Sequence, residues 1–196
     1  ALAILSSLPT VVITSAPTFA QVRAILWRYI RRMHAAADLP GRVNQTEWLI
    51  DEELVAFGRK PSDYAESAFQ GIHAPYVLVI LDEACGVKPH LWVAADSLTT
   101  NDGCRLFAIG NPDNSASEFK KVCTPGSGWH VIKISAFDSP NFTDEDVPDE
   151  LRRVLVGPTY VEEVRADYGE DSPIYQSKVL GTRPRDAADT VVRYSD

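Results

Sequence analysis

A run of strand-forming apolar residues at positions 76–81, YVLVIL, is followed at once by the adjacent carboxylates Asp82 and Glu83. A continuous apolar run of this length predicts a strand that is buried on both faces of a parallel sheet. In open parallel sheets, ligands bind at the carboxyl ends of the strands. We therefore expect both carboxylates at the binding edge of a sheet.

An apolar strand followed by Asp-Glu is the Walker B pattern of nucleoside triphosphatases. In that role Asp82 holds Mg²⁺ through water, and Glu83 polarises the water that attacks the γ-phosphate of ATP. Taken alone, the pattern is also typical of a buried strand that ends in an acidic turn. The sequence contains no GxxxxGK[ST] phosphate loop, so it shows only half of a phosphate site.

Strands and helices alternate along most of the chain, and this alternation predicts an α/β fold with a mainly parallel sheet. Buried strands are expected at residues 8–15, 76–81, 104–109 and 129–135, with a β-hairpin at the side of the sheet at 47–59. Helices are expected at residues 17–34, 89–97 and 115–122, and a short helical extension at 149–156, 159–168 and 172–180.

A second polar group, Gly110-Asn111-Pro112, directly follows the strand expected at 104–109. One strand-helix-strand unit separates it from Asp82, so the two groups should lie side by side at the same sheet edge. The amide of Asn111 can sense a γ-phosphate or orient the attacking water, while Gly110 and Pro112 fix a tight backbone. A plain turn after the strand is the alternative interpretation.

A third group ends the first expected strand and opens the helix that follows it. Thr14 and Ser15 stand at the strand end, and Thr18 and Gln21 stand in the first turn of the helix. Hydroxyl groups and a helix N-terminus at this edge could contact a phosphate group or the DNA backbone. Helix capping by Thr18 explains the pattern equally well.

Charge and cysteine content restrict the function further. The net charge of −8 argues against broad electrostatic adhesion to nucleic acid or to an anionic membrane. Arginines nevertheless gather on the helix expected at 17–34, as a solvated face or as a contact for DNA or a partner. The three cysteines form no CxxC motif and favour a reduced cytosolic setting, and no apolar run reaches the length of a membrane span.

Several motifs in one order resemble the large terminase subunit of tailed bacteriophages, the ATP-driven motor that packages DNA. The matching stretches are residues 14–27, 69–87, 106–112, 134–142 and 168–181, within a similarity that extends over residues 8–184. Several separate motifs in a fixed order form a more specific signal than any one of them.

The resemblance implies a RecA-like P-loop NTPase core, a mainly parallel sheet flanked by helices. Asp82 and Glu83 then occupy the Walker B positions. Gly110, Asn111 and Pro112 match the motif that couples loss of the γ-phosphate to movement of DNA. Mg²⁺ and ATP are the cofactors of the intact protein.

The resemblance also implies a division of the chain and a set of partners. Residues 1–140 correspond to a partial ATPase domain without the Walker A strand and loop, 141–182 to its helical extension, and 183–196 to a linker toward a nuclease domain. We therefore expect a fragment that binds no ATP and hydrolyses it negligibly. The implied partners are double-stranded DNA, the portal, the small terminase subunit and further copies of the chain, in the cytoplasm of a bacterial host and without a membrane.

Two other interpretations remain open at this stage. The first is a helicase-like motor, because Asp-Glu-Ala resembles the DEAD box, although such helicases carry Ser-Ala-Thr where Gly-Asn-Pro stands here. The second is a non-catalytic prophage remnant that acts only through association with other proteins. Titration with nucleotide separates this second interpretation from an ATPase.

Overall fold

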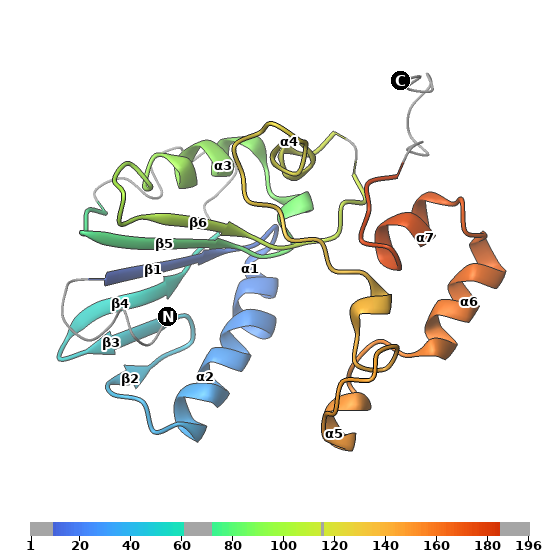
Figure 1. Ribbon diagram of the computed structural model, residues 1–196. Helices are drawn as coiled ribbons and strands as arrows, with labels where there is room; N and C mark the ends of the chain where they lie inside the picture. The colour runs from blue at the N-terminus through green and yellow to red at the C-terminus, as the bar shows by residue number, and fades with distance from the viewer. Residues whose placement is uncertain (1–9, 61–71, 115, 185–196) are drawn as a thin grey trace. The chain divides into compact units, whose positions relative to one another are not determined.

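The computed structural model describes residues 10–60, 72–114 and 116–184. The chain divides into two compact units between Gly110 and Asn111. The first unit contains a sheet with its helices, and the described part of the second contains helices and loops without strands (Figure 1). None of the helices in the described ranges is long and apolar enough to cross a membrane.

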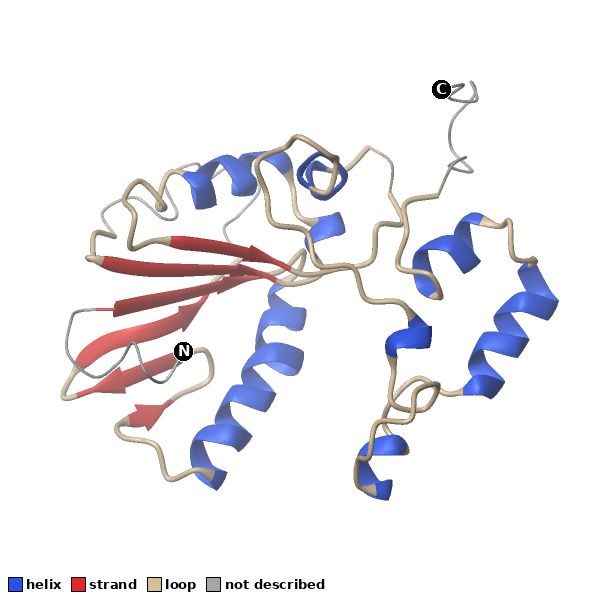
Figure 2. Cartoon of the chain, viewed as in Figure 1, coloured by secondary structure: helices blue, strands red, loops and turns tan. Residues whose placement is uncertain are grey.

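The first unit has a six-stranded mixed sheet in the order β2-β3-β4-β1-β5-β6 (Figure 2). The strands are β1 (Thr10–Ser15), β2 (Arg42–Val43), β3 (Glu47–Ile50), β4 (Glu53–Gly58), β5 (Tyr76–Leu81) and β6 (Arg105–Ala108). Strands β4, β1, β5 and β6 run parallel, whereas β2, β3 and β4 pair antiparallel. The predicted α/β class and the hairpin of β3 and β4 are confirmed, and β4 joins the parallel part of the sheet directly.

The helices of the first unit agree with the sequence pattern. They are α1 (Phe19–Gln21), the π-helical η2 (Val22–Leu26), α2 (Trp27–Ala36), the 3-10 helix η3 (Ala84–Gly86) and α3 (Pro89–Asp96). The helix predicted at 17–34 is therefore confirmed, with a π turn inside it. Pro89 occupies the start of α3, where its missing N–H costs no helical hydrogen bond.

Helix α2 is fixed to the sheet by the fully buried Trp27, which packs in a cluster with Val22, Ala16 and Ala56. Its indole Nε1 donates a hydrogen bond of 2.8 Å to Thr14 Oγ1. The sheet leaves room for this ring only because residue 58 is glycine. A Cβ at that position would lie 2.3 Å from the indole nitrogen.

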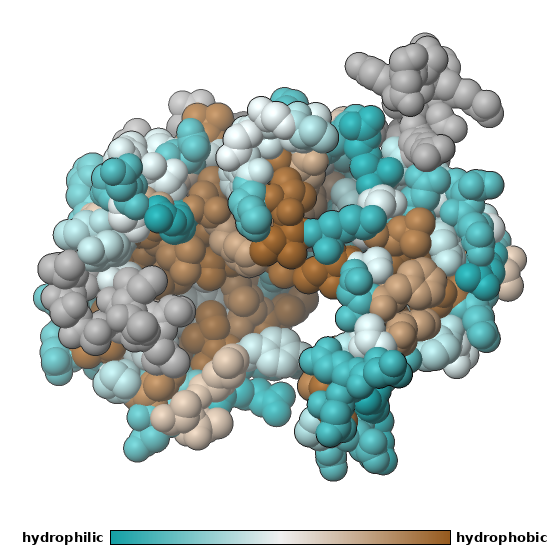
Figure 3. Space-filling view, viewed as in Figure 1, coloured by the Kyte–Doolittle hydropathy of each residue, from teal (hydrophilic) through white to brown (hydrophobic). Residues whose placement is uncertain are grey.

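The two faces of β5 differ in burial. Val77, Val79 and Leu81 are buried on one face, whereas Leu78 and Ile80 on the other are only half-buried. Phe107, which is in register with Ile80, is 49% exposed on that second face. Helix α2 packs over β1, β3 and β4. Because one face of β5 is only half-buried, the prediction that β5 is buried on both faces is only partly confirmed. Figure 3 shows apolar side chains at the surface over this sheet.

The second unit contains α4 (Glu118–Val122), the 3-10 helix η4 (Ala136–Asp138), α5 (Asp149–Arg152), α6 (Pro158–Tyr168) and α7 (Pro173–Lys178). Its core is formed by Ala136, Val161, Val164, Tyr175 and Val179. The helices predicted at 159–168 and 172–180 are confirmed, while α5 is shorter than predicted. The sequence pattern predicted neither a helix nor a strand for residues 136–138, which form η4.

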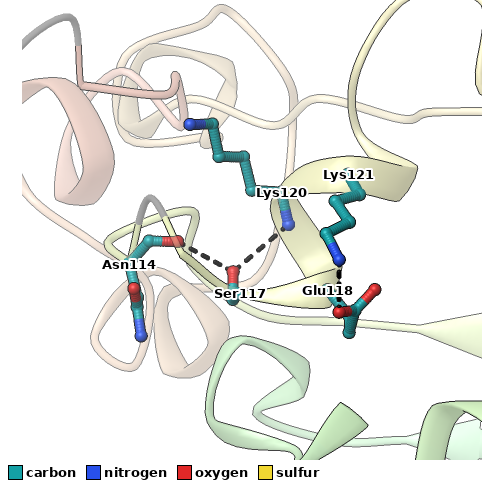
Figure 4. A network of polar contacts seen from close by, with 5 residues as sticks. All are labelled: Asn114, Ser117, Glu118, Lys120 and Lys121. Carbon is teal, nitrogen blue, oxygen red and sulfur yellow. Dashed lines mark hydrogen bonds and ion pairs between the residues drawn. The ribbon is translucent and has the colours of Figure 1, made fainter.

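Helix α4 begins later than the sequence predicts because Ser117 caps it (Figure 4). The Ser117 hydroxyl accepts a hydrogen bond of 3.2 Å from the Lys120 amide and donates one of 2.8 Å to the Asn114 carbonyl. Lys121 and Glu118 form an ion pair of 2.6 Å along the exposed side of the helix. The observed helix is therefore a short, well-capped turn rather than the longer helix predicted at 115–122.

The strand predicted at residues 129–135 is wrong. The segment is not paired with any strand of the described chain, and Val131, Ile132 and Ile134 are exposed. Apolar, β-branched residues favour an extended backbone, but a strand also needs a neighbouring backbone to receive its hydrogen bonds. The local pattern therefore did not predict that this segment pairs with no other strand among the described residues.

All three cysteines are free, in agreement with the absence of a CxxC motif. Cys85 and Cys104 are buried in the first unit, and Cys123 is partly buried in the second.

Asp138 gives the second unit a testable dependence on pH. Its Oδ2 accepts a hydrogen bond of 2.7 Å from the Ser135 amide, and the Ser135 hydroxyl accepts one from the Phe137 amide. The backbone hydrogen bond from Ser135, followed by its side-chain bond, lowers the pKa of Asp138 below the ordinary 3.8. A lowered pKa stabilises the fold above the unfolded pKa, and the contribution is lost as the pH falls through the folded value.

We therefore expect Asp138→Asn to lower the urea midpoint near neutral pH, and the difference from wild type to disappear as the pH falls through the lowered pKa of Asp138. Asp146→Asn is the matched control, because Asp146 is exposed on the same unit and should leave the midpoint unchanged. A difference between Asp138→Asn and wild type that persists at low pH would contradict the assignment.

Candidate active site

Three parallel strands of the first unit end at one edge of the sheet. Ser15 ends β1, Asp82 follows β5, and Gly110 comes shortly after β6. The Asp82 amide donates a hydrogen bond of 2.9 Å to the Ser15 carbonyl, and the Ala84 amide donates one of 2.9 Å to the Ile109 carbonyl. The acidic turn is therefore held by hydrogen bonds to the strand ends on both sides of it.

Glu83 gives this turn its shape. Its backbone is left-handed, with φ 48° and ψ 45°, an uncommon conformation for a residue other than glycine. The Asp82 carboxylate accepts a hydrogen bond of 3.0 Å from the Glu83 amide and is partly buried. The Glu83 side chain is exposed, and its carboxylate has no hydrogen-bond or ion-pair partner within the described part of the chain. It is therefore free to orient a water molecule.

Gly110 lies directly against the acidic turn. A Cβ at this position would be 3.0 Å from the Ala84 amide nitrogen and 3.5 Å from the Glu83 carbonyl carbon. The spacing along the chain predicted this approach, and the lack of a side chain permits it. Asn111 and Pro112 begin the second unit, where the Asn111 carbonyl accepts a hydrogen bond of 2.9 Å from the Asp113 amide. Their proposed roles remain predictions.

Thr14 and Ser15 differ in how their hydroxyl groups are used. Thr14 Oγ1 accepts the indole hydrogen bond from Trp27 and lies 3.5 Å from the Phe57 carbonyl, to which it donates. The Thr14 hydroxyl therefore serves the packing between sheet and helix. Ser15 is also buried, but its Oγ has no hydrogen-bond partner among the residues that the structure describes. Of the two, only the Ser15 hydroxyl is uncommitted near Asp82.

Thr18 and Gln21 form a capping box at the start of α1. The Gln21 amide donates to Thr18 Oγ1 at 3.2 Å, while Gln21 Oε1 accepts from both the Thr18 amide and the Thr18 hydroxyl. Helix capping, the alternative interpretation of this motif, is therefore confirmed. A phosphate or DNA contact at these residues would have to compete with these bonds.

Arg59 is a candidate that the sequence analysis missed. It follows β4, whose carboxyl end lies beside that of β1, and its amide donates a hydrogen bond of 3.0 Å to the Thr14 carbonyl. Its exposed guanidinium stacks 4.8 Å from the centre of the Phe57 ring. A guanidinium at this edge suits an approaching phosphate. The signal in the sequence was an arginine directly after an apolar strand, but residues 47–59 were interpreted as a hairpin at the side of the sheet.

Asp82 is suited to a metal ion that arrives together with a nucleotide. In proteins Mg²⁺ is usually bound by one or two carboxylates together with substrate phosphates and water. Over the described ranges, no group of three or more His, Cys, Asp or Glu residues is arranged to hold a metal ion. Asp82 could therefore contribute one carboxylate ligand to such an ion.

The sequence matches no protein-family model, and no curated protein matches it. The function is therefore inferred from the geometry of this sheet edge together with the order of the motifs.

Proposed function

We propose that the chain is the motor ATPase part of a phage or prophage terminase large subunit, in which ATP turnover drives double-stranded DNA into a procapsid. The acidic turn of Asp82 and Glu83 carries the proposal, because it lies at the carboxyl edge of a parallel sheet with Gly110 packed against it. The finer fold that we propose is a RecA-like P-loop NTPase core, with Mg²⁺ and ATP as cofactors of the intact protein.

Each residue of the turn has a defined task in this proposal. Bound Mg²⁺-ATP supplies the phosphoryl group that is transferred to water. Asp82 holds the hydrated Mg²⁺, and Glu83 orients and polarises the attacking water. The Ala84 amide bonds to the Ile109 carbonyl, so a movement of the acidic turn is passed to the loop that begins at Gly110. In this proposal, the hydrogen bond links a change in the bound nucleotide to the loop that leads along the chain into the second unit.

A non-catalytic remnant is the second candidate, and the missing GxxxxGK[ST] loop favours it. In these enzymes, backbone N–H groups and the lysine of that loop anchor the phosphates. A chain without them leaves Asp82 and Glu83 with no fixed phosphate. The chain would then act only through association with other proteins.

Calorimetric titration with Mg²⁺-ATP tests the proposal on the protein expressed from the full coding sequence that contains this chain. We expect micromolar binding that weakens at least about tenfold in Asp82→Ala, because the metal loses its carboxylate. Asp102→Ala is the matched control, because Asp102 precedes β6 at the opposite edge of the sheet and should bind as wild type. Absence of nucleotide binding in wild type would overturn the ATPase and support the non-catalytic candidate.

A further inference from the structure

Two polar side chains at the carboxyl edge of the sheet have no role in the proposed mechanism, and the first of them is Ser15. This residue is fully buried, and its hydroxyl has no hydrogen-bond partner in the described ranges 10–60, 72–114 and 116–184. A buried hydroxyl without a partner gives up its hydrogen bonds to water and gains none in exchange, so it destabilises the fold. Such groups are rare in proteins, and a ligand that completes the hydrogen bond explains why one is kept.

Arg59 is the second of these side chains. It is exposed, and its guanidinium lies 4.8 Å from the centre of the Phe57 ring. Within the described part of the chain, this guanidinium forms no ion pair and no side-chain hydrogen bond. Its N–H donors are therefore available to a ligand, while stacking on Phe57 keeps the group at the edge of the sheet.

The register of the sheet brings these two side chains together. Ile13 of β1 and Phe57 of β4 are direct partners, and Ser15 and Arg59 each follow two residues later. The Arg59 amide continues the ladder with a hydrogen bond of 3.0 Å to the Thr14 carbonyl. Residues two apart along a strand point to the same face, and neighbouring strands lie about 4.8 Å apart. The side chains of Ser15 and Arg59 therefore leave the sheet side by side on one face.

A guanidinium beside a hydroxyl offers hydrogen-bond donors and one positive charge, which suits the oxygens of a phosphate group. The pair also adjoins the acidic turn, because the Ser15 carbonyl accepts the hydrogen bond of 2.9 Å from the Asp82 amide. Duplex DNA fits this pair less well, because DNA binding depends on many phosphate contacts and the chain has a net charge of −8. The chemistry therefore favours one phosphate group with free terminal oxygens.

We propose that Arg59 and Ser15 form a subsite for one terminal phosphate group, either the γ-phosphate of a bound nucleotide or free inorganic phosphate. The guanidinium donates to two of the phosphate oxygens, and Ser15 Oγ donates to a third. The inference rests on the proposed function where the phosphate belongs to ATP, whereas binding of inorganic phosphate does not require it. Arg59 and Ser15 then determine which phosphate group is held next to Asp82.

Titration with inorganic phosphate, followed by the NMR shifts of backbone amides, tests the subsite on the protein expressed from the full coding sequence that contains this chain. We expect the Ser15 and Arg59 signals to move in wild type. Arg59→Gln should bind phosphate at least about tenfold more weakly, because it loses a charged donor. Arg28→Gln is the matched control and should bind as wild type, because Arg28 is also exposed and stacked 5.2 Å from an aromatic ring but lies on α2. Signals of Ser15 and Arg59 that do not move, or equal losses in both variants, overturn the subsite.

Ser15→Ala separates a ligand contact from a structural role. Phosphate binding should weaken about three- to tenfold, because one hydrogen bond to the anion is lost. The urea midpoint should stay equal to that of wild type or rise, because the variant removes a buried hydroxyl that has no partner in the described chain. A lower midpoint together with unchanged phosphate binding would show that the hydroxyl serves only the fold, and would overturn its place in the subsite.

Calorimetric titration with Mg²⁺-ATP and Mg²⁺-ADP distinguishes the two sources of phosphate. A loss of at least about tenfold in Arg59→Gln for ATP, with ADP binding within a few-fold of wild type, assigns the γ-phosphate. Equal affinities of Arg59→Gln and wild type for both nucleotides, with inorganic phosphate binding still lost in the variant, assign free phosphate.

The same titrations separate failure of the subsite from failure of the ATPase. A wild type that binds inorganic phosphate through Arg59 but binds no nucleotide overturns the ATPase and supports the subsite. Nucleotide binding that depends on Asp82 but not on Arg59, without phosphate shifts at Ser15, overturns the subsite and leaves the ATPase intact. A wild type in which Arg59 binds duplex DNA and no inorganic phosphate also overturns the subsite.

Discussion

Glu83→Gln should lower steady ATP hydrolysis by about 10²–10³-fold in the protein that contains this chain, while Mg²⁺-ATP still binds within a few-fold of wild type. The amide keeps the size of the side chain but cannot accept a proton or polarise water as a carboxylate does. Glu83 is exposed and has no partner among the described residues, so the substitution removes no interaction of the fold. The substitution should therefore lower the rate of ATP hydrolysis without lowering the stability of the fold.

Phosphate release under saturating ATP measures this effect, and nucleotide titration of the same samples shows that binding is retained. Glu53→Gln is the matched control, because Glu53 begins β4 at the amino end of the parallel strands, away from the acidic turn. It should hydrolyse ATP at the wild-type rate. Undiminished hydrolysis by Glu83→Gln would exclude Glu83 as the residue that activates water.

The acidic turn shows how far local sequence carries a prediction. A buried strand is specified by its own apolar residues, so both the bounds of β5 and the position of Asp82 just after it could be read from the sequence. The left-handed backbone of Glu83 could not, because glutamate seldom adopts it and only the surrounding hydrogen bonds hold it there. The strand was therefore predictable, while the direction of the Glu83 carboxylate that follows it was not.

Long-range pairing accounts for the other differences. Residues 129–135 have the composition of a strand, yet strand formation depends on a neighbour that lies far away in sequence. Arg59 was missed for the same reason, because nothing in the sequence of residues 47–59 indicates that β4 pairs in parallel with β1. Once that pairing is known, Arg59 falls at the carboxyl edge with Ser15 and Asp82.

Trp27→Ala should have the largest effect on stability, about 3–5 kcal/mol in the free energy of unfolding. The ring is fully buried against Ala16, Ala56 and the glycine at position 58, none of which can extend to fill the void. Trp27→Phe should cost less, because it keeps most of the apolar volume and loses mainly the hydrogen bond to Thr14. Urea unfolding followed by circular dichroism measures both variants.

Met33→Ala is the matched control on the same helix, because Met33 is 68% exposed and its truncation should change stability by no more than about 0.5 kcal/mol. An equally small effect of Trp27→Ala would mean that α2 does not hold the sheet. The two variants should also differ at the acidic turn. Thr14 precedes Ser15, whose carbonyl accepts the Asp82 amide, so hydrogen exchange at Asp82 should accelerate in Trp27→Ala and stay at the wild-type rate in Met33→Ala.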